Sequence, residues 1–407
     1  MQRRGGDDEE DVELGELENA AFLPRGTAEV ERQAAGGGIL KWVRGFVAGL
    51  SRIRLMLLVL SIFITILVWL GFLNADSVPA AVPPESQALA DELAASLKDT
   101  AIPAFVLTYA PLVFLDKKDA FHPSDLAAHI AHTHPEVNFT RVRDVPDPLT
   151  LGNLDVLNSV NRSSAGDIYL TSTEDVTQLP RFLRGRKPDA KTLRTEKAVS
   201  CAVVVVEKGD GVVDAFYMYF YTFNRGPSVY GHVIGDHLGD WEHNMIRFKD
   251  GHPSAVWYSQ HEYGAAYTYA TVPKIGVRPI SFSARGSHAN YATAGKHDLH
   301  SSSDAIPANL VYDHTSLGPL WDPTLAAYFY TYEVESGKFE SVLGETAWLG
   351  FEGRWGDAEY ADEKLGQETW QGFHRWTAGP QGPAFKGLGR DQVCLPGRQE
   401  CVVREEI

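Results

Sequence analysis

One short run, residues 235–243, concentrates the side chains most able to do chemistry. In an extended strand, successive side chains point to opposite faces, so Asp240 and Glu242 would share one face while Trp241 and His243 share the other. Two carboxylates that leave water together repel each other, and a bound cation removes that penalty. Oxygen ligands with one imidazole suit calcium, magnesium or manganese. We therefore predict a divalent-cation site whose ligands are His237, Asp240, Glu242 and Asp236.

The alternative for this run is a loop and a strand whose charged face contacts water. In that case its acidic residues would have no function beyond solubility.

A second polar cluster covers residues 284–297, where strand alternation would place the side chains of His288 and Asn290 on one face. A further histidine and acid pair follows the apolar run that ends at Ser259. We predict that these segments contribute ligand-binding residues, namely His288, Asn290, Arg285, His243 and His261. The alternative is a polar loop at a sheet edge, with Tyr291 packed in the core. The run Gly286-Ser287-His288 does not satisfy the Gly-x-Ser-x-Gly elbow of serine hydrolases, which argues against a nucleophilic serine.

The elements that must position these residues are strands. Beyond residue 200 the chain consists of β-branched and aromatic runs separated by glycine, proline and Asp-Gly pairs. No alternating helix pattern separates the runs, so we predict an antiparallel β-sandwich with a few short helices, over residues 101–390. We expect a C-terminal tail over residues 391–407. The predicted strands run from Val212 to Phe223, Asp240 to Phe248, Ala255 to Ser259, Tyr267 to Val272, Ile280 to Ala284 and Tyr328 to Val334.

The first hundred residues have a different composition. Residues 1–38 are acidic, glycine-containing and poor in large apolar side chains, which predicts a disordered tail. Residues 39–54 form a basic juxtamembrane segment, and residues 55–73 are apolar and uncharged, close to the roughly 20 residues that cross a bilayer as a helix. Residues 74–100 read as a proline-containing linker followed by one short amphipathic helix.

Basic residues precede the predicted span and are lacking from 74 to 97. The positive-inside rule then predicts a single-pass type II protein with a cytosolic N-terminus and a luminal C-terminal domain in the endomembrane system. Two sequons, at Asn138 and Asn161, fall on the predicted luminal side, where we expect glycosylation.

The chain has three cysteines, too few for a disulfide framework. In an oxidising lumen Cys394 and Cys401 could close a short loop, whereas Cys201 lies in an apolar run typical of a buried free thiol. The 37 basic and 53 acidic residues give a net charge of −16, which argues against nucleic acid as a partner.

Several motifs, in one order along residues 100–385, carry a resemblance to a known family. They are Tyr109-Ala110-Pro111, Pro123-Ser124-Asp125, Gly235-Asp236-His237 with Asp240-Trp241-Glu242-His243, Ser259-Gln260-His261, Ala284 to Tyr291 and Gly353-Arg354-Trp355-Gly356-Asp357. Together they resemble the vacuolar protein sorting-associated protein 62 family of fungi and plants. The resemblance implies a membrane-anchored, vacuolar fungal protein linked to protein delivery to the vacuole, without an established catalytic activity.

A shorter resemblance concerns the first run alone. His237-Leu238-Gly239-Asp240-Trp241-Glu242 is similar to the heptapeptide Gly-His-Arg-His-Asp-Trp-Glu of the necrosis- and ethylene-inducing-like cytolysins. Those proteins are β-sandwiches that hold a divalent cation and bind sphingolipid sugar head groups. The resemblance implies a cation role for His237, Asp240 and Glu242. Leu238-Gly239 departs from the motif, so the lytic activity is not carried over.

Three functional hypotheses follow. The first is a membrane-anchored luminal protein that uses a divalent cation (calcium, magnesium or manganese) to bind a glycan or lipid head group. The second is a metal-dependent hydrolase with His288 or His243 as general base. The third is a sorting adaptor that binds partner proteins through its surface.

Overall fold

The computed structural model describes residues 35–73, 77–160, 168–299, 309–364, 366–397 and 400–407. It divides into two compact units, residues 1–75 and residues 76–407. Most of the predicted acidic tail and the sequon at Asn161 lie outside the described residues.

The first unit contains one long helix, α1 (Ala35–Leu73). It takes in the predicted basic segment and the predicted span, and it begins within the last residues of the predicted tail. Over the part of the chain that the structure describes, no helix combines the length and the apolarity that crossing a membrane requires. The span at 55–73 is therefore helical, and its insertion in a bilayer stays a prediction.

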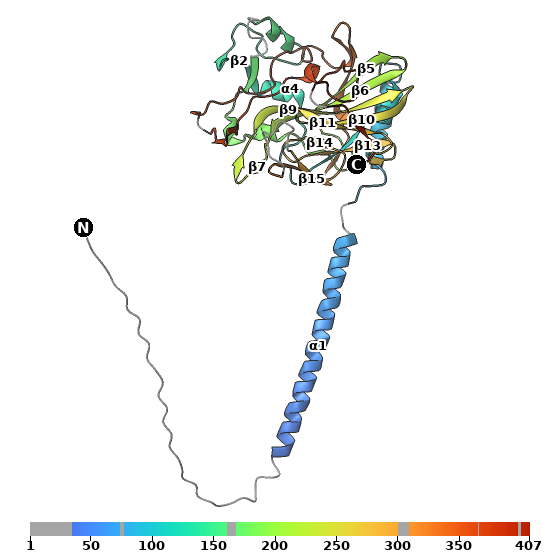
Figure 1. The fold of residues 1–407 in the computed structure, drawn as a ribbon, viewed down its shortest axis with the longest axis vertical. Coiled ribbons are helices and arrows are strands. Elements are labelled where there is room, and N and C mark those ends of the chain that lie inside the picture. Colours follow the sequence, from blue (N-terminus) through green and yellow to red (C-terminus); the bar gives the residue numbers. More distant parts are fainter. Residues whose placement is uncertain (1–34, 74–76, 161–167, 300–308, 365, 398–399) are drawn as a thin grey trace, which may run out of the picture. The chain divides into compact units, whose positions relative to one another are not determined.

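An eight-stranded sheet forms the centre of the second unit, with the order β19-β18-β5-β6-β9-β10-β11-β22. Strands β5, β6, β9, β10 and β11 lie side by side, as Figure 1 shows. Their sequences are rich in valine, tyrosine and phenylalanine, which favour the half-buried, pleated surface of a sheet. The strands are β5 (Cys201–Gly209), β6 (Val212–Asn224), β9 (His237–Lys249), β10 (His252–Gln260), β11 (Tyr263–Thr268), β18 (Ala327–Glu333), β19 (Lys338–Leu343) and β22 (Val403–Arg404).

A second, five-stranded sheet has the order β12-β13-β1-β17, with β14 paired to β13. Its strands are β1 (Leu112–Leu115), β12 (Lys274–Ile275), β13 (Arg278–Ser283), β14 (Asn290–Tyr291) and β17 (Leu320–Trp321). The mainly β class with a few short helices is confirmed. The strictly antiparallel arrangement is wrong, because β1 and β13, β5 and β18, and β11 and β22 pair in parallel. Long connections between these partners permit that pairing.

Two cores lie on the two faces of the central sheet. On one face, Tyr217, Tyr219 and Tyr221 of β6 pack with Val113 and Trp321 of the second sheet. The opposite face packs against a cluster of tryptophans and phenylalanines, which comprises Trp241, Trp348, Trp355, Phe216 and Phe220.

Short elements surround the sheets. The helices are α2 (Pro84–Ser96), α3 (Ala104–Thr108) and α4 (Leu126–Ala131). The remaining strands are β2 (Thr133–Val137), β3 (Thr140–Arg141), β4 (Ile168–Ser172), β7 (Ser228–Val229), β8 (His232–Val233), β15 (Gly295–Asp298), β16 (Tyr312–Thr315), β20 (Thr369–Trp370) and β21 (Phe373–His374).

The predicted C-terminal tail is partly structured. A disulfide joins Cys394 to Cys401, as expected, and β22 then pairs with β11. Cys201 is a buried free thiol, also as expected.

Candidate functional site

The candidate site lies along one end of β9. Strand β6 pairs with β9 from His237 to Lys249, whereas β10 pairs with it only from Asn244 onward. From His237 to His243 the other edge of β9 has no paired strand among the described elements. The backbone at this end is therefore paired on one edge, and its side chains from Leu238 to His243 are buried.

Strand alternation over this end is as predicted. Asp240 and Glu242 share the face that carries the tyrosines of β6, and Trp241 lies in the tryptophan cluster on the opposite face. The structure buries both carboxylates, with relative exposures of 6% for Asp240 and 3% for Glu242.

Asp240 meets the second predicted cluster through His288. The Nδ1 atom of His288 lies 2.8 Å from Asp240 Oδ2, and its Nε2 atom lies 3.7 Å from the carboxylate of Asp119. The ring also stacks on Tyr221 at 3.7 Å between centroids. Burial alone would lower the pKa of His288, but the hydrogen bond to Asp240 and the charge of Asp119 raise it above its ordinary value. The imidazole of His288 thus lies between two carboxylates.

The turn that brings His288 to Asp240 depends on Gly286. Its φ of +77° is in the left-handed region, and a Cβ atom there would lie 2.5 Å from the carbonyl oxygen of Arg225. Only glycine tolerates both conditions. Segments far apart in the sequence therefore converge, which the sequence could suggest only as an expectation.

Glu242 has only neutral hydrogen-bond donors. The Ser259 hydroxyl donates to its Oε2 atom, and the backbone N–H of His261 donates to Oε1 at 3.2 Å. Burial, followed by the charge of Asp240, raises the pKa of Glu242 to about 7. The pair therefore resists carrying two negative charges at neutral pH.

His261 is the predicted ligand-binding residue that most clearly faces the site. Its Nε2 atom lies 3.0 Å from Asp313, which also accepts hydrogen bonds from Ser287 and Tyr291. Burial would lower the pKa of His261, but Asp313 and Glu242 raise it to about 9. Asp313 organises this corner, and the sequence analysis missed it. The only signal was the alternation of Val311, Asp313 and Thr315 on a short strand.

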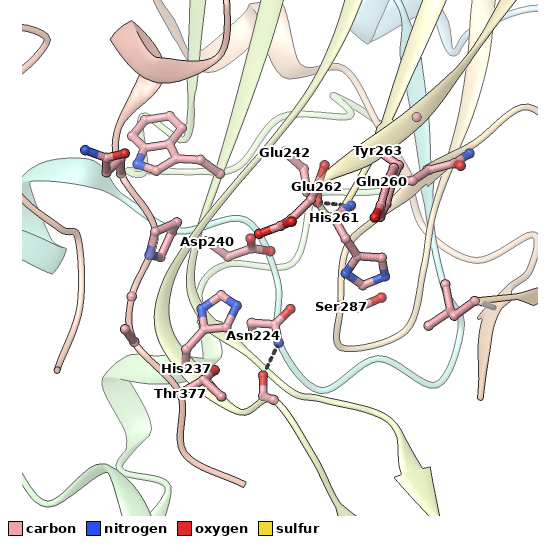
Figure 2. A pocket seen from close by; sticks show the side chains of 18 of the residues that line it. Asn224, His237, Asp240, Glu242, Gln260, His261, Glu262, Tyr263, Ser287 and Thr377 are labelled. Carbon is pink, nitrogen blue, oxygen red and sulfur yellow. Dashed lines mark hydrogen bonds between the residues drawn. The ribbon is translucent and has the colours of Figure 1, made fainter. Parts of the chain in front are cut away.

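Asp240, Glu242 and His261 line one pocket of about 1330 Å³, whereas His288, predicted to bind the ligand, is not part of its wall. Figure 2 shows the side chains of Asp240, Glu242 and His261 directed toward the same space, with His237 nearby. Other parts of the wall come from the hairpin β20–β21 and from residues 377–387. The sequence analysis did not include this C-terminal part of the wall.

Four predicted residues have other roles. Asp236 is fully buried in ion pairs with Arg225, at 2.7 Å, and Arg375, at 3.4 Å, so it is not available to a metal. Arg285 pairs with Asp116 at 3.0 Å and is not part of the pocket wall. The two other residues are His243 and Asn290.

His243 points to the opposite face of the sheet, where its Nε2 atom lies 3.4 Å from Arg390. Burial and then the charge of Arg390 lower its pKa well below the ordinary value, so it stays neutral. Asn290 is buried with its carbonyl oxygen bonded to Ser281, and its Nδ2 atom has no partner among the described residues. Neither residue lines the pocket.

The hydrolase hypothesis loses support from this arrangement. Of its two proposed bases, His243 is on the wrong face, and His288 is 1% exposed with Nδ1 already bonded to Asp240. A general base must reach the proton that it removes.

The donor set for a cation consists of two carboxylates. His237 bonds through Nδ1 to the carbonyl oxygen of Gly239 at 2.7 Å, and burial lowers its pKa. Over the described residues, no group of three or more histidine, cysteine, aspartate or glutamate side chains is arranged to hold a metal ion. Any cation here would need further ligands from solvent or from a bound molecule.

One of the two predicted glycosylation sites is described. Asn138 is exposed in the turn between β2 and β3, so its side chain is accessible, and its modification stays a prediction.

Comparison with known proteins identifies the family. A model of the family described as vacuolar protein sorting-associated protein 62 matches residues 227–367. The chain is 34% identical over 358 residues to TDA6 of Saccharomyces cerevisiae, and the match covers 80% of this chain and 76% of TDA6. The name of TDA6 assigns it provisionally to vacuolar protein sorting. The chain belongs to the vacuolar protein sorting-associated protein 62 family. Vacuolar protein sorting-associated protein 62 of the same yeast is also 34% identical, over 72% of this chain and 68% of its own length.

Solved structures give weaker matches. One is described as a toxin fold for microbial attack and plant defense, with 11% identity, a TM-score of 0.23 and coverage of 60% of this chain and 79% of that chain. Another is NLPPya in complex with glucosamine, also with 11% identity and a TM-score of 0.23, covering 68% and 84%. TM-scores this low support no statement about the fold or ligand of this family member, so the cation role that the short resemblance implies for His237, Asp240 and Glu242 stays a prediction.

Proposed function

We propose that this family member takes part in the delivery of proteins to the vacuole, as the names of its relatives describe, by binding a glycan or lipid head group through a divalent cation at Asp240 and Glu242. The single observation that carries the proposal is the pair of buried carboxylates on one wall of a large pocket. The hydrogen-bond partners of the two carboxylates are consistent with a bound cation.

The electrostatic balance supports a cation. His288 is shared between Asp240 and Asp119, and His261 is bonded to Asp313, so neither imidazole is dedicated to Glu242. Glu242 itself receives hydrogen bonds only from an hydroxyl and a backbone amide. A buried carboxylate without a cationic partner is costly, and a divalent ion offsets that cost.

The chemistry of the donors favours calcium, magnesium or manganese. Magnesium in particular is often held by one or two carboxylates together with water and substrate oxygens. The Asp240 Oδ1 atom accepts no hydrogen bond from the described residues, so it is available for a ligand. The pocket supplies the room for the hydroxyl or head-group oxygens that would complete the coordination.

Isothermal titration calorimetry on the full chain with calcium, magnesium and manganese tests the cation site. We expect binding by the wild type and at least a tenfold weaker affinity in Asp240→Asn and in Glu242→Gln. Glu340→Gln, on the exposed strand β19, is the matched control and should bind as the wild type does. If both acid variants bind as tightly as the control, the proposed site is wrong.

The adaptor hypothesis gives an opposite result. A sorting adaptor that recognises proteins by surface shape would keep its partners in EDTA, whereas a cation-dependent site would release its ligand. Pull-downs with and without chelator therefore separate the two.

We further propose that α1 anchors the protein in an endomembrane through residues 55–73, with the C-terminal domain on the luminal side. From Leu55 to Ile66 the helix is exposed around its whole circumference, and its side chains are almost all apolar. A helix that is apolar all round is typical of a buried or membrane environment. Resistance to alkaline extraction and protease protection of the C-terminal domain would agree with this anchor, and release into the alkaline supernatant would contradict it.

A further inference from the structure

We infer that Lys386 forms an anion-binding subsite beside the acidic pair, so that the ligand of this pocket carries a phosphate group. This inference rests on the proposed function, because it names the chemical class of the ligand at the same site. It selects a phosphate-bearing head group or sugar over a neutral glycan.

Lys386 is an unpaired cation in the wall of the pocket. It follows the short turn Pro383–Phe385 and is half-buried. Among the described residues its ammonium group has no hydrogen bond, ion pair or aromatic partner. Partial burial removes some of the water around an ammonium group, and this costs free energy when no partner replaces that water. A bound anion would therefore stabilise the ammonium group.

Arg354 repeats this pattern on another part of the same wall. Its guanidinium group makes one hydrogen bond, from Nη1 to the carbonyl oxygen of Gly379 at 3.2 Å, and no ion pair with a described carboxylate. Elsewhere in the domain, half-buried arginines bind aspartates closely, as Arg247 binds Asp214 at 2.7 Å. Arg404 also lines the pocket and bonds to the hydroxyl oxygen of Tyr267 at 3.2 Å, so three basic groups of the wall have no ion pair with a described carboxylate.

Lys386 is not the ion-pair partner of Glu242. The positive charge of Lys386 acts on Glu242 and opposes the rise of its pKa, so the two groups lie within electrostatic range. They nevertheless form no ion pair within 4.0 Å, which a flexible lysine side chain would make if pairing were its role. A ligand that contacts both the cation at Glu242 and the ammonium of Lys386 would satisfy both groups.

A phosphate has the chemistry to contact both groups. One phosphate oxygen can ligate a divalent cation held by Asp240 and Glu242, while another accepts a hydrogen bond from Lys386. A neutral sugar could satisfy the cation but would leave the ammonium group without a charged partner. The wall carries five carboxylates and three basic residues, and the basic groups without a carboxylate partner are the ones that a phosphorylated ligand would neutralise.

Calorimetry on the full chain in magnesium tests the inference with glucose, glucose 6-phosphate and glycerophosphoinositol. We expect the wild type to bind at least one of the phosphorylated compounds at least tenfold more tightly than glucose. Preference for glycerophosphoinositol assigns a lipid head group as the source of the phosphate, and preference for glucose 6-phosphate assigns a soluble sugar phosphate. Equal affinity for all three compounds would overturn the inference.

Variants of Lys386 test whether its positive charge causes the preference for phosphate. Lys386→Gln should lose the preference for phosphate, Lys386→Arg should retain most of it, and Lys338→Gln on exposed β19 is a charge-matched control that should change nothing. Magnesium alone should bind Lys386→Gln as tightly as the wild type or more tightly, because a nearby positive charge has been removed. Weaker magnesium binding in this variant would instead indicate a structural role for Lys386 and would overturn the inference.

Failure of the proposed function would look different. If magnesium does not bind the wild type, the cation site is wrong, and the same titrations in EDTA then decide the anion subsite alone. A phosphate preference that persists in EDTA and is lost in Lys386→Gln supports the subsite. Its absence from the wild type rejects both proposals.

Discussion

The two faces of β9 between His237 and His243 have the same backbone and opposite chemistry. On one face Trp241 packs among aromatic rings, with centroid distances of 4.8 Å to Phe220 and 5.3 Å to Trp355. On the other face Asp240 and Glu242 line an open pocket. One strand therefore joins a rigid core directly to the charged groups, which limits how far the carboxylates can move apart.

The histidines show the same difference. His243, on the packed face, is fully buried, and burial and then the charge of Arg390 lower its pKa. On the pocket side His288 is also buried and the side chain of His261 is 37% exposed, and the carboxylate partners of both raise their pKa values. The charge of a histidine in this protein is set by its partner and not by burial alone.

The packed face should be the more sensitive to a change of volume. We expect Trp241→Ala to lower the free energy of unfolding by about 3–5 kcal/mol, because it leaves a large cavity among aromatic rings. Chemical denaturation measures this loss. Trp370→Ala, on the half-buried hairpin β20–β21, is the control and should cost clearly less. Equal losses would mean that the aromatic cluster is no tighter than a surface hairpin.

Gly239 tests the contact between β9 and the loop that carries Trp355. Its φ is +68°, and an added Cβ would lie 1.9 Å from the carbonyl oxygen of Trp355. Gly239→Ala should therefore cost about 2–4 kcal/mol, from backbone strain and forced displacement of that loop. Gly209→Ala has a similar φ of +80° with nothing within 4 Å, so it should show the strain alone. If the two variants lose the same stability in denaturation, the close approach is unimportant.

The pocket face should govern the pH dependence of stability. Because the pKa of Glu242 is raised from 4.5 to about 7, its contribution is fully present below pH 4.5 and is lost as the pH rises through 7. The raised pKa of His261, about 9, adds a loss of the same sign from pH 6.5 upward. In EDTA, raising the pH from 4.5 to 7 should therefore destabilise the wild type more than Glu242→Gln. We expect the unfolding free energy of the variant to gain about 1–3 kcal/mol relative to that of the wild type over this range.

Thermal unfolding of both proteins across that pH range measures the shift. His261→Gln is a useful comparison, since its effect should be confined to the higher pH range. A wild type and Glu242→Gln variant with parallel pH profiles would show that the two carboxylates do not interact as their geometry implies.

Local pattern was enough to predict much of the domain. The β-branched and aromatic runs indicated five of the strands after residue 200 to within a few residues, namely β6, β9, β10, β13 and β18. The predicted strand from Tyr267 to Val272 was misplaced, because it shares only Tyr267 and Thr268 with β11. The parallel pairings were not predictable from local pattern, because they join strands more than a hundred residues apart, such as β5 and β18. Cys394 and Cys401 are close in sequence, and their disulfide needed only a short loop.

The candidate site also has features that local pattern predicts and features that it does not. The shared face of Asp240 and Glu242 follows from the period of a strand, and the period is a property of the backbone. Asp236 was assigned wrongly because its arginine partners, Arg225 and Arg375, lie on separate segments, and the second of them is 139 residues away.

The sequence by itself determined which side chains β9 presents to each face, since alternation depends only on an extended backbone. Tertiary structure alone decided which of those groups have partners: His288 for Asp240 and Ser259 for Glu242. The reason is physical. Charge, hydration and pKa depend on atoms within a few ångströms, and the chain brings such atoms together from distant segments, as with His288, which is 48 residues from Asp240, a separation that no local pattern encodes.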